Sequence, residues 1–114
     1  MDVQLSKQGR VLVAKPLARW LDEKSSSDLH RVVAAEIEKG ERFIVLDMTE
    51  VAHSDSAALG TLIRLLKLVP QGGRLVLGGC PPAMRQLLEK ARLNHILVSY
   101  PTDRDAITSL SGGG

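Results

Sequence analysis

Apolar residues in this chain occur either as short continuous runs or at the three- and four-residue spacing of a helix. Residues 2–7 alternate weakly between apolar and polar, and the turn-forming pair Gln8-Gly9 follows them. We therefore expect 2–7 and the apolar run 10–14 to form a hairpin. Further continuous runs, typical of buried strands, lie at 43–46, 74–78 and 95–99.

Helical spacing predicts three helices and a short terminal one. The first follows a serine run, has Ser27 as its N-cap candidate and stops at Gly40. The second ends near Val69, where Pro70-Gln71-Gly72-Gly73 breaks the pattern. The second helix is expected to start near Ser56, the third at Pro81 or Pro82, and the terminal one at 101–103.

The resulting order of elements is ββαβαβαβα. Strands separated by single helices imply parallel neighbours joined by right-handed crossovers, with the hairpin strand at one edge. The expected fold is one α/β domain over residues 1–110, with a mixed, mostly parallel sheet. Residues 111–114 are expected to be a flexible tail, because they have no apolar side chain to pack.

Composition narrows the class of protein. The 114 residues are 44% hydrophobic and 25% charged, but only 3% aromatic, so the core must be aliphatic. No apolar run reaches the roughly 20 residues needed to span a bilayer, and the first residues lack a secretory pattern. We expect a cytoplasmic protein without membrane insertion. The net charge of +2 is small and scattered, which argues against nucleic-acid binding.

Metal and cofactor chemistry finds little support in the residue pattern. Cys80 is the single cysteine, so an internal disulfide is excluded. It is far in sequence from the three histidines, and no group has the spacing of metal ligands: His30, His53 and His95. The glycine pair at 72–73 matches neither phosphate-loop pattern. We expect no bound cofactor and no metal.

The polar stretch His53-Ser54-Asp55-Ser56 lies between a predicted strand and a predicted helix. Ligand and partner sites of α/β proteins concentrate at this end of a strand. A hydrolase triad would need its nucleophile, base and orienting residue to converge from separate segments, and these residues are neighbours. We therefore do not expect an enzyme. An alternative role for Ser56 is simply that of helix N-cap.

The sequence from Ile44 to Val51, Ile-Val-Leu-Asp-Met-Thr-Glu-Val, is followed by Asp-Ser-Ala-Ala-Leu-Gly at 55–60. This pattern resembles the STAS domain of bacterial anti-sigma factor antagonists, in which a hydrophobic-Leu-Asp-Leu strand leads into Asp-Ser-Ser-Gly-Leu-Gly at a helix start. The resemblance continues at Leu21-Asp22, at the turn and strand 72–77, and through the helix containing 85–88, so that it covers residues 2–110.

The resemblance implies a STAS fold and a partner-switching function. Members of the family bind an anti-sigma factor, often a serine kinase, and so free a sigma factor for transcription. The kinase inactivates them by phosphorylating the serine after the aspartate, which corresponds to Ser56, and a metal-dependent serine phosphatase restores them. Ser54 is a second candidate for phosphorylation. The implied partner-binding residues are Asp22, His53, Ser54, Asp55, Ser56, Ala57, Ala58 and Leu59.

Two pairs of residues depart from the family pattern. Ala57-Ala58 replaces Ser-Gly, and Arg19-Trp20 replaces Gly-Glu before Leu-Asp. Ala58 is expected to add a methyl group at the surface. Trp20 is either a lid packed on the core or a contact anchor, and His53 is either a turn residue or a pH sensor.

Two other functions are compatible with the pattern. One is a STAS scaffold without phosphorylation, in a sensor complex or as an accessory subunit of a lipid-transport ATPase. The other is a domain that binds a nucleotide or small molecule, although the chain has no phosphate loop.

Overall fold

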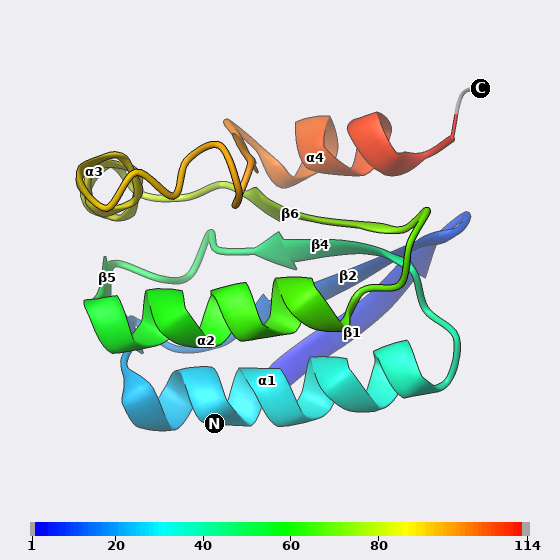
Figure 1. The fold of residues 1–114 in the computed structure, drawn as a ribbon, viewed down its shortest axis with the longest axis horizontal. Coiled ribbons are helices and arrows are strands. Elements are labelled where there is room, and N and C mark those ends of the chain that lie inside the picture. The colour runs from blue at the N-terminus through cyan, green and yellow to red at the C-terminus, as the bar shows by residue number, and fades with distance from the viewer. Residues whose placement is uncertain (1, 113–114) are drawn as a thin grey trace.

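A computed structural model of the chain describes residues 2–112 and shows a five-stranded sheet in the order β1-β2-β4-β6-β7 (Figure 1). The strand β1 is antiparallel to β2, and every other neighbouring pair is parallel. The α/β fold class and the N-terminal hairpin are thus confirmed. The strands of this sheet are β1 (Val3–Gln8), β2 (Val11–Pro16), β4 (Phe43–Asp47), β6 (Arg74–Gly78) and β7 (Ser99–Tyr100).

The part of the chain that the structure describes has four helices, three of which cover the two faces of the sheet. The helices α1 (Glu23–Glu38) and α2 (Ser56–Leu68) lie side by side on one face and begin at the same end of the molecule (Figure 1). The helix α4 (Asp103–Leu110) covers the other face, over β6, β4 and β2. The helix α3 (Pro82–Lys90) lies beyond the carboxyl end of β6, and Pro82 is its first residue as expected.

Two further strands form a small separate sheet at this same end. β3 (Trp20–Leu21) pairs in parallel with β5 (His53–Ser54). Backbone bonds from Ala52 and His53 to the carbonyl of Arg19, at 2.7 and 2.9 Å, extend the pairing. The segment before α1 is therefore tied to the segment before α2.

The core is aliphatic, as the composition predicts. Alternate residues of β4 point to opposite faces of the sheet: Ile44 and Leu46 pack under α1 and α2, whereas Val45 packs under α4. Among residues 2–112, twelve large side chains less than 2% exposed form most of this interior, and all twelve are Leu, Ile or Met. No helix within residues 2–112 is long and apolar enough to cross a membrane.

The start of the first helix differs from the prediction. Ser27 lies inside α1, and the N-cap is Asp22. The Asp22 carboxylate accepts the N–H of Ser25 at 3.0 Å, while the Ser25 hydroxyl accepts the N–H of Asp22 at 2.9 Å. This reciprocal capping box satisfies two amides at the helix start, so that the helix begins before the serine run rather than after it.

The last strand is shorter and begins later than predicted, because only Ser99 of the stretch 95–99 belongs to it. The chain turns there, with the N–H groups of Ile96 and Leu97 both bonded to the carbonyl of Leu93, at 2.9 and 2.8 Å. Leu97 is buried, but Ile96 is 51% exposed, so the apolar run does not mark a buried strand. The N–H of Leu77 in β6 bonds to the carbonyl of Val98 at 2.9 Å, and the strand beside β6 starts at Ser99 and ends at Tyr100. Of the predicted tail, Ser111 caps α4, and 113–114 lie outside the described residues.

Candidate functional site

The β3–β5 pairing places Asp22 and Asp55 at equivalent positions. Trp20 is the register partner of His53, and Leu21 that of Ser54, so that an aspartate follows each strand directly. Each aspartate is the N-cap of the helix that follows it. The N–H of Asp55 also bonds to the carbonyl of Leu21 at 3.4 Å. Two helix starts therefore lie side by side at one end of the molecule.

The start of α2 assigns different roles to Asp55 and Ser56. The Asp55 carboxylate accepts the N–H of Ala58 at 2.9 Å, from an extended backbone conformation. Ser56 is the first helical residue, and its side chain is exposed. Within residues 2–112 its hydroxyl has no hydrogen-bond partner. The interpretation of Ser56 as an N-cap is therefore wrong, and this hydroxyl is uncommitted.

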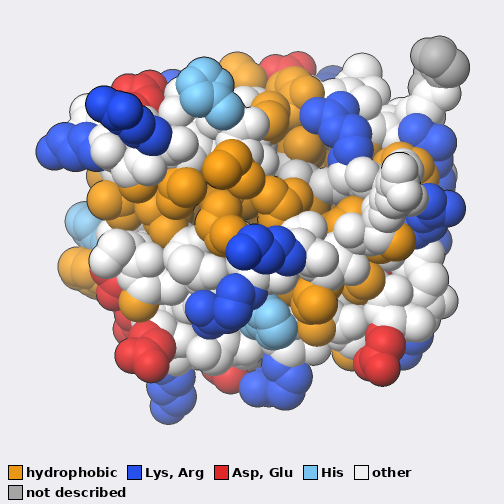
Figure 2. All heavy atoms as spheres, viewed as in Figure 1, with side chains coloured by type: hydrophobic (Ala, Val, Ile, Leu, Met, Phe, Trp, Pro, Cys, Tyr) orange, Lys and Arg blue, Asp and Glu red, His pale blue; other side chains and the backbone are white. Residues whose placement is uncertain are grey.

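An acidic hollow of about 580 Å³ opens between the two helix starts. Figure 2 shows acidic side chains at the left end of the molecule, where both helices begin. Hydrogen bonds from the backbone and hydroxyl of Ser25 lower the pKa of Asp22, so this carboxylate stays ionised. The residues lining the hollow are Asp22, Glu23, Lys24, Ser27, Asp28 and Asp55.

Trp20 and His53 form an exposed aromatic pair beside this hollow. Their ring centroids are 4.4 Å apart and the planes are inclined by 27°, which is a stacked arrangement. Trp20 is 58% exposed, so its interpretation as a lid on the core is wrong. A large rigid ring held in solvent by a neighbouring ring is suited to contact with a partner.

Two of the predicted contact residues are not available to a partner, and the hydroxyl of a third is buried. Ala58 is fully buried and Leu59 is 2% exposed, both within the main hydrophobic core. The expectation of a surface methyl at Ala58 is thus wrong: the methyl packs inward. The Ser54 hydroxyl oxygen is buried and makes no hydrogen bond in the described structure, which argues against modification there. The other five predicted contact residues are exposed: Asp22, His53, Asp55, Ser56 and Ala57.

Sequence reasoning missed the contribution of the first turns of α1. Glu23, Lys24 and Asp28 line the hollow, but a helix starting after Ser27 would have placed Glu23 and Lys24 in a loop. The available signal was the capping-box pair Asp22 and Ser25. A serine at the third helical position is a weaker signal than the usual glutamate or glutamine.

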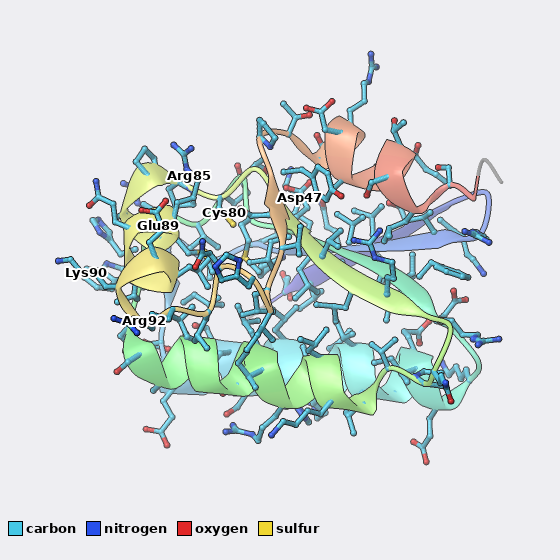
Figure 3. The ribbon with its side chains drawn as sticks, turned by 45° about the horizontal axis from the view of Figure 1, so that its top comes forward. Asp47, Cys80, Arg85, Glu89, Lys90 and Arg92 are labelled. Carbon is cyan, nitrogen blue, oxygen red and sulfur yellow. The ribbon has the colours of Figure 1, made fainter. Side chains whose placement is uncertain are left out.

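Other charged or ionisable side chains lie around α3, outside the acidic hollow. Figure 3 shows Arg85, Glu89 and Lys90 along α3, with Cys80 at the junction between β6 and α3. Burial raises the pKa of the Cys80 thiol to about 12, against a weak opposing effect of Arg85, so the thiol stays protonated. Within residues 2–112 no group of three or more His, Cys, Asp or Glu side chains has a geometry that could hold a metal ion.

Comparison with known proteins identifies the family. The model of the STAS domain matches residues 3–106 of this chain. The chain therefore belongs to the STAS domain family.

Solved structures of anti-sigma factor antagonists have the same fold. One from Mycobacterium paratuberculosis is 19% identical, with a TM-score of 0.86 over 96% of this chain and 92% of that one. A putative one from Thermotoga maritima is 22% identical, with a TM-score of 0.84 over 95% and 93%. The Bacillus cell fate determinant SpoIIAA in its phosphorylated form is 19% identical, with a TM-score of 0.70 over 95% and 98%.

Proposed function

We propose that this protein is an anti-sigma factor antagonist, which binds an anti-sigma factor and is switched off by phosphorylation of Ser56. The observation that carries the proposal is the position of Ser56: exposed, uncommitted and first in α2, next to the Asp55 cap. The hydroxyl can be modified without breaking a bond that holds the helix. The likeness in fold to anti-sigma factor antagonists supports the same function.

The contact surface in this proposal combines the Trp20–His53 pair, the acidic hollow and the start of α2. A basic segment of the partner complements the carboxylates of Asp22 and Asp55, and the exposed ring of Trp20 supplies apolar area. The partner is an anti-sigma factor that is also a serine kinase. A metal-dependent serine phosphatase reverses the modification, and the protein itself supplies no catalytic group.

Phosphorylation acts on this surface through the bulk of the phosphate and the cost of removing its charges from water in a packed contact. A phosphate adds nearly two negative charges beside Asp55, while the amides and positive dipole end of α2 tolerate an anion there. The fold is therefore kept while the packed contact is lost. A preference of about 2–3 kcal/mol for the unmodified form changes the affinity by roughly 30- to 150-fold, which is enough for a switch.

A labelling experiment tests the modification. The protein is incubated with its anti-sigma kinase and ATP, and the intact mass is measured. We expect one added phosphate of about 80 Da, absent from Ser56→Ala and unchanged in Ser54→Ala. Labelling that persists in Ser56→Ala, or no labelling of the wild type, would contradict the proposed site.

A further inference from the structure

The side chain of Arg64 runs back along α2 toward the helix start. Its Nη2 donates to the Thr61 hydroxyl at 2.9 Å, and this hydroxyl donates to the carbonyl of Ala57 at 3.2 Å. Its Nη1 lies 3.9 Å from the place that a Cβ atom on Gly60 would occupy. The guanidinium is thus held over Gly60, about one turn from the residue that carries the proposed phosphate.

Gly60 leaves the path between Ser56 and this guanidinium open. Ser56 and Gly60 are four residues apart, so they are neighbours on the helix surface, with about 5–6 Å between Cβ positions. A side chain at residue 60 would stand between the phosphate and Arg64, and glycine has none. Apart from the adjoining residues and the backbone of α2 itself, Arg64 is the described residue that lies within 4 Å of the missing Cβ.

The charge of Arg64 is unpaired in this structure. Among residues 2–112 it makes no ion pair, and its only side-chain partner is the neutral Thr61 hydroxyl. One hydrogen bond leaves most of the five guanidinium donors available. The planar fork of arginine donors matches the geometry of phosphate oxygens. The Arg64 guanidinium already lies over Gly60, so it needs little rearrangement to reach a phosphate on Ser56.

We propose that Arg64 is the intramolecular partner of phosphorylated Ser56, reached across the gap at Gly60. The guanidinium donates to the phosphate oxygens, draws the phosphate along α2 away from the Asp55 carboxylate and favours its dianionic form. This inference rests on the proposed modification of Ser56 and adds how the modified state is stabilised. Arg64 acts here as a positioning residue, and it slows removal of the phosphate by occupying oxygens that a phosphatase must engage.

The test uses full-length protein with phosphoserine inserted at position 56 during translation, so that no kinase is needed. The second pKa of the phosphate is measured by ³¹P NMR titration in four backgrounds: the wild type, Arg64→Gln, Gly60→Leu and Lys67→Gln. Lys67 is an exposed cation in the last turn of the same helix, and its variant is the matched control for loss of one charge.

We expect the phosphate pKa to rise by about 0.5–1 unit in Arg64→Gln, the size of an exposed contact between unit charges. Gly60→Leu should give a similar rise and Lys67→Gln almost none. Equal pKa values in the wild type and Arg64→Gln, with both proteins folded by circular dichroism, would overturn the inference. Because translation places the phosphoserine, this titration decides the Arg64 contact whatever the kinase assay shows for the proposed function.

Discussion

The carboxylate of Asp55 holds the N–H of Ala58 at 2.9 Å and so leaves the adjacent Ser56 hydroxyl without a structural bond. Helix capping and the proposed modification are therefore carried by two neighbouring residues. A residue that both caps a helix and receives a phosphate would couple the switch to stability. Here the two properties are expected to vary independently.

Substitution at these two neighbours separates the roles. Asp55→Ala removes the cap and should lower the free energy of unfolding by about 1 kcal/mol, whereas Asp55→Asn keeps an acceptor and should lower it much less. Ser56→Ala and Ser56→Asp should remain within about 0.5 kcal/mol of the wild type. Urea unfolding measures all four. A loss at Ser56→Ala as large as that at Asp55→Ala would contradict this division.

Replacement of Ser54 is expected not to destabilise the protein, because its hydroxyl is buried. It makes no hydrogen bond in the described structure, so the fold carries the cost of desolvating it. Ser54→Ala is expected to be neutral or to stabilise the protein by up to about 1 kcal/mol in thermal or urea unfolding. A clear destabilisation would show that the hydroxyl has a partner after all.

Trp20 is expected to be an anchor for the partner. Trp20→Ala should weaken binding of the anti-sigma factor by about 2 kcal/mol, or roughly 30-fold, because exposed aromatic residues often dominate interfaces. The fold should lose no more than about 1 kcal/mol, the size of the stack on His53. Leu5, 41% exposed on the edge strand β1, offers the matched control, and Leu5→Ala should bind normally. Equal affinities for the two variants would remove Trp20 from the interface.

Cys80 predicts a loss of stability at high pH. Burial raises the pKa of its thiol from 9.0 to about 12, so the unfolded chain releases this proton before the folded protein does. Its contribution is complete below pH 9 and declines as the pH rises toward 12. Relative to Cys80→Ala, the wild type should lose about 2 kcal/mol between pH 8 and pH 10.5. Parallel pH profiles for the two proteins would contradict the raised pKa.

The sequence was sufficient for the fold because the main elements carry local periodicity. The start of α2 at Ser56 and the proline start of α3 follow from residues within a few positions. Continuous apolar runs marked β2, β4 and β6. The same reasoning failed over most of 95–99, where Leu97 is buried and Val98 packs partly against the core, but Ile96 is exposed.

The candidate site was harder to predict because distant pairing builds it. β3 and β5 are two residues long, too short for any periodicity, and their register brings Trp20 to His53. The burial of the Ser54 hydroxyl and of Ala58 depends on which side of the chain faces the core after this pairing. A motif indicates which residues are neighbours in sequence but not which side chains reach the surface.

The most direct test of the central claim compares the affinity of the anti-sigma factor for two forms of this protein. One carries serine and the other phosphoserine at position 56, and binding is measured by titration calorimetry. The account predicts tight binding of the serine form and a roughly 30- to 150-fold weaker phosphoserine form of equal thermal stability. Equal affinities for two folded forms would contradict it.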